Sequence, residues 1–339
     1  MAHNITRKDT LAYTGAMPWH GIGEDVRELQ TAQAMGERVY PWTVGAVPVY
    51  RRSSNEALTF EVVPGYVGIQ RSDTHDVLSV VTDQYRPFQN AQAMEVVDAL
   101  IAEGQAVVEV AGSIREGRLC WALAQLPGEY TVIGDDAVRP YFLLAWGHDG
   151  KHGVAGKLTF VRVVCDNTLT AALGTTWSQN ASIYFRHHGD VTLRLADART
   201  ALGLVREQAR ESVLAYQRLA CTPVEDPAVV RYFAGVFPLA VAPGDLSDKA
   251  TDARERWDAL QRELVHLYTH GAGNDAPGVR GTAWAAYNAV TEYLDHVYPV
   301  RQNGTVSPTR QQSVLFGSKA PLRQDALTAA LALGQRTSS

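Results

Sequence analysis

The fold of this chain is decided by residues 107–126, which read Val-Val-Glu-Val-Ala-Gly-Ser-Ile-Arg-Glu-Gly-Arg-Leu-Cys-Trp-Ala-Leu-Ala-Gln-Leu. Two apolar, strand-like runs, 107–114 and 118–126, flank the turn residues Glu116 and Gly117. Such runs, joined by a short turn that contains glycine, are typical of an antiparallel hairpin. The sequence therefore predicts an antiparallel sheet built around this hairpin.

Other extended segments lie on both sides of the hairpin. Short runs with turn residues between them predict strands at 44–50, 58–63, 66–69, 78–82, 140–146 and 157–164. We expect 140–146 and 157–164 to form a second antiparallel pair. Asn90 is a suitable N-cap for a helix from Ala91 to about Glu103, which carries one apolar stripe. The first forty residues show too few periodic apolar positions to predict an element.

After residue 193 the pattern becomes helical. The predicted helices cover residues 197–221, 251–269, 282–297 and 322–333. The glycine-rich stretch 271–281 is expected to be a mobile linker. We expect an α+β fold, with an antiparallel-sheet N-terminal body and a mostly helical C-terminal region. The expected divisions are an N-terminal arm (1–40), an α+β core domain (41–194) and a helical domain (195–335).

Composition excludes several classes of protein. The chain has 339 residues, of which 46% are hydrophobic and 20% charged, as in ordinary globular proteins. It has no run of eighteen apolar residues, so we expect no membrane span, and its N-terminus lacks the apolar stretch of a signal peptide. Its three cysteines, Cys120, Cys165 and Cys221, form no CxxC pair. That usage favours a reducing cytoplasm over a disulfide framework or a zinc site.

Polar chemistry is concentrated around one predicted strand end. The stretch Trp146-Gly-His-Asp-Gly-Lys-His-Gly153 precedes the apolar run 157–164, and Arg186-His-His-Gly-Asp190 follows it. Residues 151–194 contain five basic and two acidic residues, a charge of +3 in a chain whose net charge is −5. A local basic patch of this kind favours an anionic partner.

The expected site holds phosphates and stacks bases. If a helix opens after Cys165, the free N–H groups of Asn167 and Thr168 could receive a phosphate. The predicted phosphate-binding residues are Lys151, Lys157, Arg162, Asn167, Arg186 and Arg86, and the predicted stacking residues are Trp146, Tyr184 and Trp19. In the alternative interpretation, Asp166 or Asn167 is an ordinary N-cap, Arg162 forms an internal salt bridge, and Trp19 docks on the body of the protein or on a neighbouring subunit.

Catalytic and metal sites are not predicted. The histidines His148, His152, His187 and His188 match no standard ligand spacing. Glu292 and His296 stand four residues apart on a predicted helix, where surface pairing is the commoner arrangement. We therefore expect no metal, no cofactor and no catalytic residue. Cys165 as a nucleophile remains an alternative to a buried small side chain.

Four segments together resemble one family. They are Pro18-Trp-His-Gly-Ile-Gly23, Thr82-Asp-Gln-Tyr-Arg-Pro-Phe-Gln-Asn90, Arg162-Val-Val-Cys-Asp-Asn-Thr-Leu169 and Asn288-Ala-Val-Thr-Glu-Tyr-Leu-Asp-His296. In this order they resemble the phage/plasmid-like proteins grouped as domain of unknown function 932. The resemblance implies a gene of phages, plasmids or other mobile elements, and it brings no assigned reaction. A more distant similarity to single-strand annealing proteins rests on analogy of fold alone.

Three functions follow as hypotheses. The first is a mobile-element protein that binds single-stranded DNA, or anneals it, in replication or recombination, as a homo-oligomer that needs no membrane. It is more readily a binding protein than an enzyme. The second is an enzyme acting on a nucleotide or a small anionic substrate, with Cys165 or a histidine of 148–152 as catalyst. The third is a phage structural or interaction protein, which predicts apolar interface patches and no concentrated basic groove.

Overall fold

A computed structural model describes residues 9–14, 23–29, 31–52, 59–102, 106–164, 168–170, 183–185, 207–298 and 319–333. Within these residues the largest element is a mixed sheet of nine strands with the main order β11-β10-β9-β7-β6-β1-β2. Its strands are β1 (Leu11–Tyr13), β2 (Glu24–Asp25), β6 (Val107–Ile114), β7 (Leu119–Gln125), β8 (Tyr130–Ile133), β9 (Asp136–Gly147), β10 (Val154–Arg162), β11 (Thr168–Thr170) and β12 (Ile183–Phe185). Every pairing is antiparallel except that of β1 with β2. The expected α+β fold is confirmed.

The predicted hairpin forms the centre of this sheet as β6 and β7. Its turn places Arg115 and Glu116 at φ of 56° and 63°, and Gly117 at 89°. A Cβ on Gly117 would lie 2.8 Å from the Trp42 ring, so only glycine fits this turn without a shift. The second predicted pair is also present, because β9 and β10 pair from Trp146 with Val154 to Val138 with Arg162.

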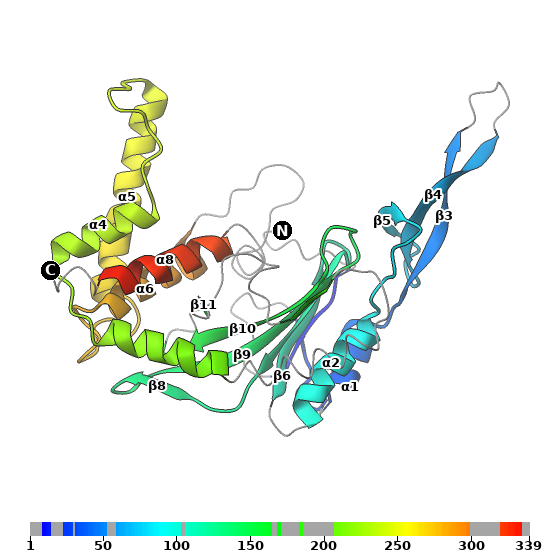
Figure 1. Cartoon of the computed structure of the whole chain (residues 1–339), viewed down its shortest axis with the longest axis horizontal. Helices are drawn as coiled ribbons and strands as arrows, with labels where there is room; N and C mark the ends of the chain where they lie inside the picture. Colours follow the sequence, from blue (N-terminus) through cyan, green and yellow to red (C-terminus); the bar gives the residue numbers. More distant parts are fainter. Residues whose placement is uncertain are drawn as a thin grey trace.

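Helices cover one face of the sheet. Helix α1 (Ala32–Val39) and helix α2 (Asn90–Ala102) pack together beside β6, β7 and β9 (Figure 1). The even-numbered residues of β9 and β10 point into this core, where Phe160 meets Tyr216 of the helical residues 207–220 edge-on at 5.5 Å. Alternation along the two strands therefore sets which side chains the helices bury.

Part of the predicted N-terminal arm is ordered structure, contrary to expectation. Strand β1 pairs with β6, and α1 begins after the N-cap Thr31, whose hydroxyl accepts the N–H of Ala34 at 3.0 Å. Helix α1 spans only eight residues, too few to be stable in isolation, although its buried residues Ala32, Met35, Gly36 and Val39 lie on one face. It is held by tertiary packing, with Met35 buried and Gly36 against Met94 of α2.

A second sheet, with the order β3-β4-β5, projects from the body (Figure 1). Its strands are β3 (Val44–Arg52), β4 (Phe60–Arg71) and β5 (Val77–Thr82). The base is buried at Ile69 and Arg71, whereas the distal halves of β3 and β4 are exposed on nearly every residue. Strands β3 and β5 match predicted strands, whereas the two strands expected at 58–63 and 66–69 form the single strand β4, without the turn expected between them. The projection of this sheet away from the core was not predicted.

The C-terminal part is helical, as expected. It contains residues 207–220, α4 (Asp226–Val236), α5 (Asp248–His270), α6 (Ala283–Glu292), the π-helix η1 (Tyr293–Val297) and α8 (Lys319–Leu333). The predicted helix 282–297 is split between α6 and η1, and α4 was missed. No helix in the described part of the chain has the length and apolarity to cross a bilayer. The expected domain divisions stay predictions.

Candidate macromolecule interface

Arg162, the last residue of β10, lies in the interior of the molecule. Its side chain is 0% exposed and donates to both carboxylate oxygens of Asp136, with Nη2 2.6 Å from Oδ2. The same guanidinium donates to the carbonyl of Ala272 and to Asn274 Oδ1, both at 3.0 Å, and to the carbonyl of Gly273 at 3.1 Å. The structure thus gives Arg162 the internal salt bridge that was the alternative interpretation. It corrects the expectation of a phosphate ligand.

The hydrogen bonds of Arg162 and Asp136 link the helical part of the chain to the sheet. Trp284 of α6 donates from Nε1 to Asp136 Oδ2 at 2.8 Å, and its ring lies 5.7 Å from the Arg162 guanidinium carbon. Asn274, which is fully buried, also donates to the carbonyl of Leu267 in α5. The loop after α5 is therefore tied down at its start, contrary to the expected mobile linker.

Trp146 and His148 are likewise interior residues. Both are 0% exposed, and one ring nitrogen of each is hydrogen-bonded to Asn90 Oδ1. The distance is 2.9 Å for Trp146 Nε1 and 3.0 Å for His148 Nε2. Asn90 completes the link by donating to the carbonyl of Trp42 at 3.0 Å. A ring in this position cannot stack on a base, so the stacking role expected of Trp146 is corrected. These residues join the end of β9 to the start of α2.

Lys157 is largely withdrawn from solvent on the middle of β10. Burial, followed by the nearby positive charge of Arg323 on α8, lowers the pKa of Lys157 to about 8. The phosphate-binding role expected of Lys157 stays a prediction.

The structure does not describe the side chains of four expected site residues. Trp19, Asn167 and Arg186 lie outside the described residues, as do Cys165, His187 and His188. Tyr184 lies in β12, where its backbone pairs opposite Ala155 of β10, but its side chain is outside the description. Their predicted roles stay predictions, but the helix that was expected to open after Cys165 is corrected, because Thr168–Thr170 form the strand β11. Within the described ranges, no group of three His, Cys, Asp or Glu residues could hold a metal ion.

Among the described residues, the expected cations Lys151 and Arg86 are exposed. Lys151 sits in a turn organised by Asp149, whose Oδ1 accepts the N–H groups of Lys151 and His152, each at 2.9 Å. Burial raises the pKa of Asp149, but the hydrogen bonds, led by that from the His152 ring, outweigh it and lower the pKa to about 2. Ser79 of β5 donates to the carbonyl of His148 at 2.8 Å, so this turn rests against the projecting sheet.

The distal part of that sheet, residues 49–52 and 59–63, is here named the β-arm. Tyr50, Phe60 and Val62 are 57%, 66% and 52% exposed. Tyr50 lies directly opposite Val62, and Arg52 directly opposite Phe60, so all four side chains share one face. The opposite face carries the ion pair of Arg51 and Glu61, at 3.2 Å. The β-arm is a two-stranded ribbon with one aromatic face open to water.

A break in strand pairing separates the β-arm from the base of the sheet. Pro48 pairs with Val67, yet Tyr50 pairs with Val62, so four residues of β4 stand opposite the single residue Val49. Gly65, in this excess stretch, has a φ of +76°. Bulges of this kind bend and twist a ribbon. The bulge thus directs the β-arm away from the body instead of across it.

The charge of the projecting sheet is balanced. Its described residues, 44–52 and 59–82, contain Arg51, Arg52 and Arg71 against Glu61, Asp73 and Asp76. Arg71 is 3% exposed and pairs with Asp73 at 2.7 Å. The predicted strand 58–63 includes Phe60 and Val62 of this face. A sequence pattern does not say, however, whether another layer of the structure covers them.

Comparison with known proteins places the chain in a family. No curated protein and no solved structure matches it. A family model matches residues 77–315, from β5 to beyond η1, and leaves β3, β4 and α8 outside the match. Because this match covers more than half of the chain, the protein belongs to the family described as Domain of unknown function (DUF932).

Proposed function

We propose that this protein is an interaction protein, which binds a protein partner through the aromatic face of the β-arm. The observation that carries the proposal is the exposure of Tyr50, Phe60 and Val62 on a ribbon that no other described element covers. An isolated two-stranded ribbon is only marginally stable in water. Contact with a partner would stabilise it by removing the exposed apolar face from water. Burying the exposed half to two-thirds of these three side chains would contribute about 3–5 kcal/mol.

A protein partner fits the charges better than a nucleic acid does. Phosphate contacts supply most of the affinity for nucleic acid, and the projecting sheet has as many acidic as basic residues. One of the expected cations, Arg162, is paired with Asp136 inside the molecule. Aromatic residues and arginine on a face that lacks a dominant charge are the composition of protein interfaces.

Single-stranded DNA is the second candidate, and one observation favours it. Tyr50 and Phe60 offer ring faces beside Arg52, with Arg86 and Lys151 exposed elsewhere on the surface. Stacking on such rings is tolerant of sequence. With about three cations in contact, the logarithm of the affinity would fall with that of salt at a slope of about −2, which is shallow for a DNA-binding protein.

A photocrosslinking experiment separates these candidates. Benzoylphenylalanine replaces Phe60 in the full chain, and the control places it at Val107, which is 62% exposed on β6. After irradiation in the producing cells, adducts are treated with nuclease or protease and identified by mass spectrometry.

The proposal expects one recurrent polypeptide joined to position 60, resistant to nuclease, absent at position 107 and lost when Val62→Asp is added. Adducts that nuclease removes would replace the proposal with the DNA-binding candidate. Equal labelling from both positions would overturn both candidates.

A further inference from the structure

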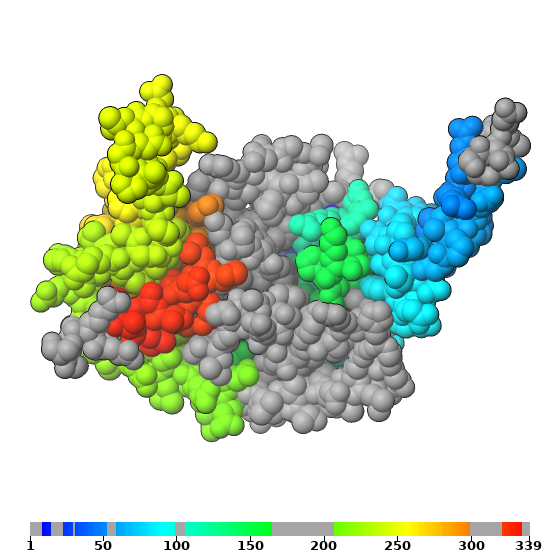
Figure 2. All heavy atoms as spheres, turned by 45° about the horizontal axis from the view of Figure 1, so that its top comes forward, coloured from blue at the N-terminus to red at the C-terminus, as the bar shows by residue number. Residues whose placement is uncertain are grey.

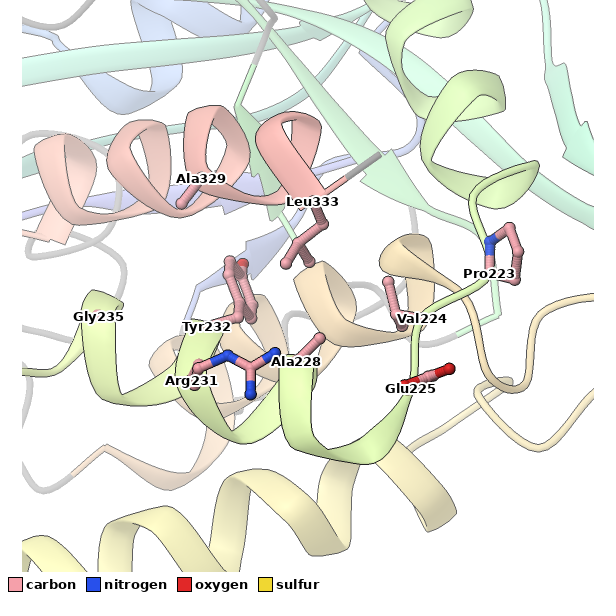
Figure 3. Close-up of a pocket in the computed structure, with 9 residues that line it drawn as sticks. All are labelled: Pro223, Val224, Glu225, Ala228, Arg231, Tyr232, Gly235, Ala329 and Leu333. Carbon is pink, nitrogen blue, oxygen red and sulfur yellow. The ribbon is translucent and has the colours of Figure 1, made fainter. Parts of the chain in front are cut away.

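A pocket of about 560 Å³ lies between α4 and the end of α8 (Figure 3). Its walls are mostly apolar, with Val224 before α4, Ala228 and Tyr232 on α4 and Leu333 at the end of α8, and the charged residues Glu225 and Arg231 also line it. Tyr232 points toward α8 and donates its hydroxyl to the carbonyl of Ala326 at 3.0 Å, which holds the two helices together. The pocket is thus built by packed helices.

The chemistry of this pocket matches that of the β-arm. Its volume can take a few large side chains, and its apolar walls suit Phe60 with Tyr50 beside it. Glu225, which is exposed at the start of α4, lines the same pocket. Arg52, directly opposite Phe60 on β3, offers the complementary charge for that carboxylate, in a pocket whose lining also includes Arg231 and so carries one charge of each sign.

The β-arm and the pocket lie at opposite ends of the molecule. Figure 1 places the tip of β3 and β4 at one end of the long axis, and α4 with the end of α8 at the other. Figure 2 gives the same separation after rotation, with the blue arm and the red helix far apart. An arm therefore cannot reach the pocket of its own chain, whereas a second copy supplies both surfaces.

We propose that the pocket between α4 and α8 receives the β-arm of a second copy of this chain, with Phe60 as the anchor. This inference rests on the proposed function, and it names the partner. The two surfaces differ, so the contact is heterologous and joins copies head to tail. Each copy then uses one arm and one pocket, and association continues into a ring or a filament.

Sedimentation velocity on paired variants tests this arrangement. Phe60→Asp removes the anchor, and Ala228→Trp fills the pocket. The matched controls are Val107→Asp, at a similarly exposed strand position, and Val230→Trp, exposed on α4 outside the pocket wall. Circular dichroism checks that each variant is folded, and Val62→Asp replaces Phe60→Asp if that variant is not.

The expected result is that each interface variant weakens self-association at least about 30-fold, the effect of removing a hot-spot residue, while the controls associate as the wild type does. An equimolar mixture of Phe60→Asp and Ala228→Trp should form a heterodimer and nothing larger, because only one intact arm and one intact pocket remain.

Other outcomes overturn the inference. If the mixture stays monomeric, or if Ala228→Trp assembles normally while Phe60→Asp does not, the arm binds elsewhere and only the proposed function survives. The same conclusion follows if the wild-type chain is monomeric at all concentrations and position 60 is joined to a different polypeptide. Failure of position 60 to label any polypeptide removes the proposed function as well.

Discussion

Replacing Arg162 by methionine should destabilise the protein strongly, because Arg162 is the counter-ion of a buried carboxylate. In the variant, Asp136 stays interior, at 7% exposure, without its cation. The carbonyls of Ala272 and Gly273 and the amide oxygen of Asn274 also lose their donors. Methionine fills part of the space but donates no hydrogen bond.

The magnitude follows from the burial of the pair. Removing one partner of a buried ion pair costs about 3–5 kcal/mol, since the remaining charge is left without compensation. A folded domain is stable by only about 5–15 kcal/mol, so the variant loses a large share of its stability. Removing both charges, in Arg162→Met with Asp136→Leu, should recover the part of the loss that comes from the uncompensated carboxylate. About 1–3 kcal/mol stays lost, because Trp284 Nε1 loses its acceptor and the three oxygens of residues 272–274 still lack the Arg162 donors.

Urea unfolding at equilibrium, followed by circular dichroism, measures these effects. For an m-value of about 3 kcal/mol/M, the single variant should unfold at a midpoint lower by about 1 M or more. The double variant should unfold between the single variant and the wild type. A single variant within about 0.2 M of the wild type, or a double variant as unstable as the single, would refute the reasoning. An exposed phosphate ligand would have left the midpoint unchanged.

Two ionisable residues give predictions about how the stability of the protein depends on pH. The folded-state pKa of Asp149, about 2, lies below its ordinary 3.8, so its stabilisation is present above about pH 4 and is lost as the pH falls through 2. Asp149→Asn should therefore lower stability by up to about 2 kcal/mol at pH 6 and by little near pH 2; an equal difference in urea midpoint at both pH values would contradict this. The folded-state pKa of Lys157 is lowered from 10.5 to about 8, so its buried charge destabilises fully below pH 8 and not above pH 10.5. Lys157→Met should be more stable by about 1–2 kcal/mol at pH 7, with a gain that vanishes near pH 10.5. A variant less stable than the wild type at pH 7 would contradict that sign.

Local patterns predicted most of the elements but not the site. The hairpin of β6 and β7 and most of the predicted helices follow from alternation and helical periodicity within short windows. The partners of Arg162 lie 26 residues away at Asp136 and 112 residues away at Asn274. Contacts at such separation leave no periodic signal. Helix α1 was missed for another reason: its buried residues Ala32, Met35, Gly36 and Val39 have helical spacing, but eight residues are too short a window for that pattern to stand out.

The sequence by itself determined the order of strands and helices, the α+β class and, through four short segments, the kinship with one family. The tertiary structure decided which charges and rings meet water. Arg52 and Arg162 each end a nine-residue strand, β3 and β10, in similar apolar surroundings along the chain. The first is exposed on a ribbon without a second layer, and the second is enclosed between a sheet and the α6 region. Burial depends on what packs across from a residue, and that neighbour comes from distant parts of the chain.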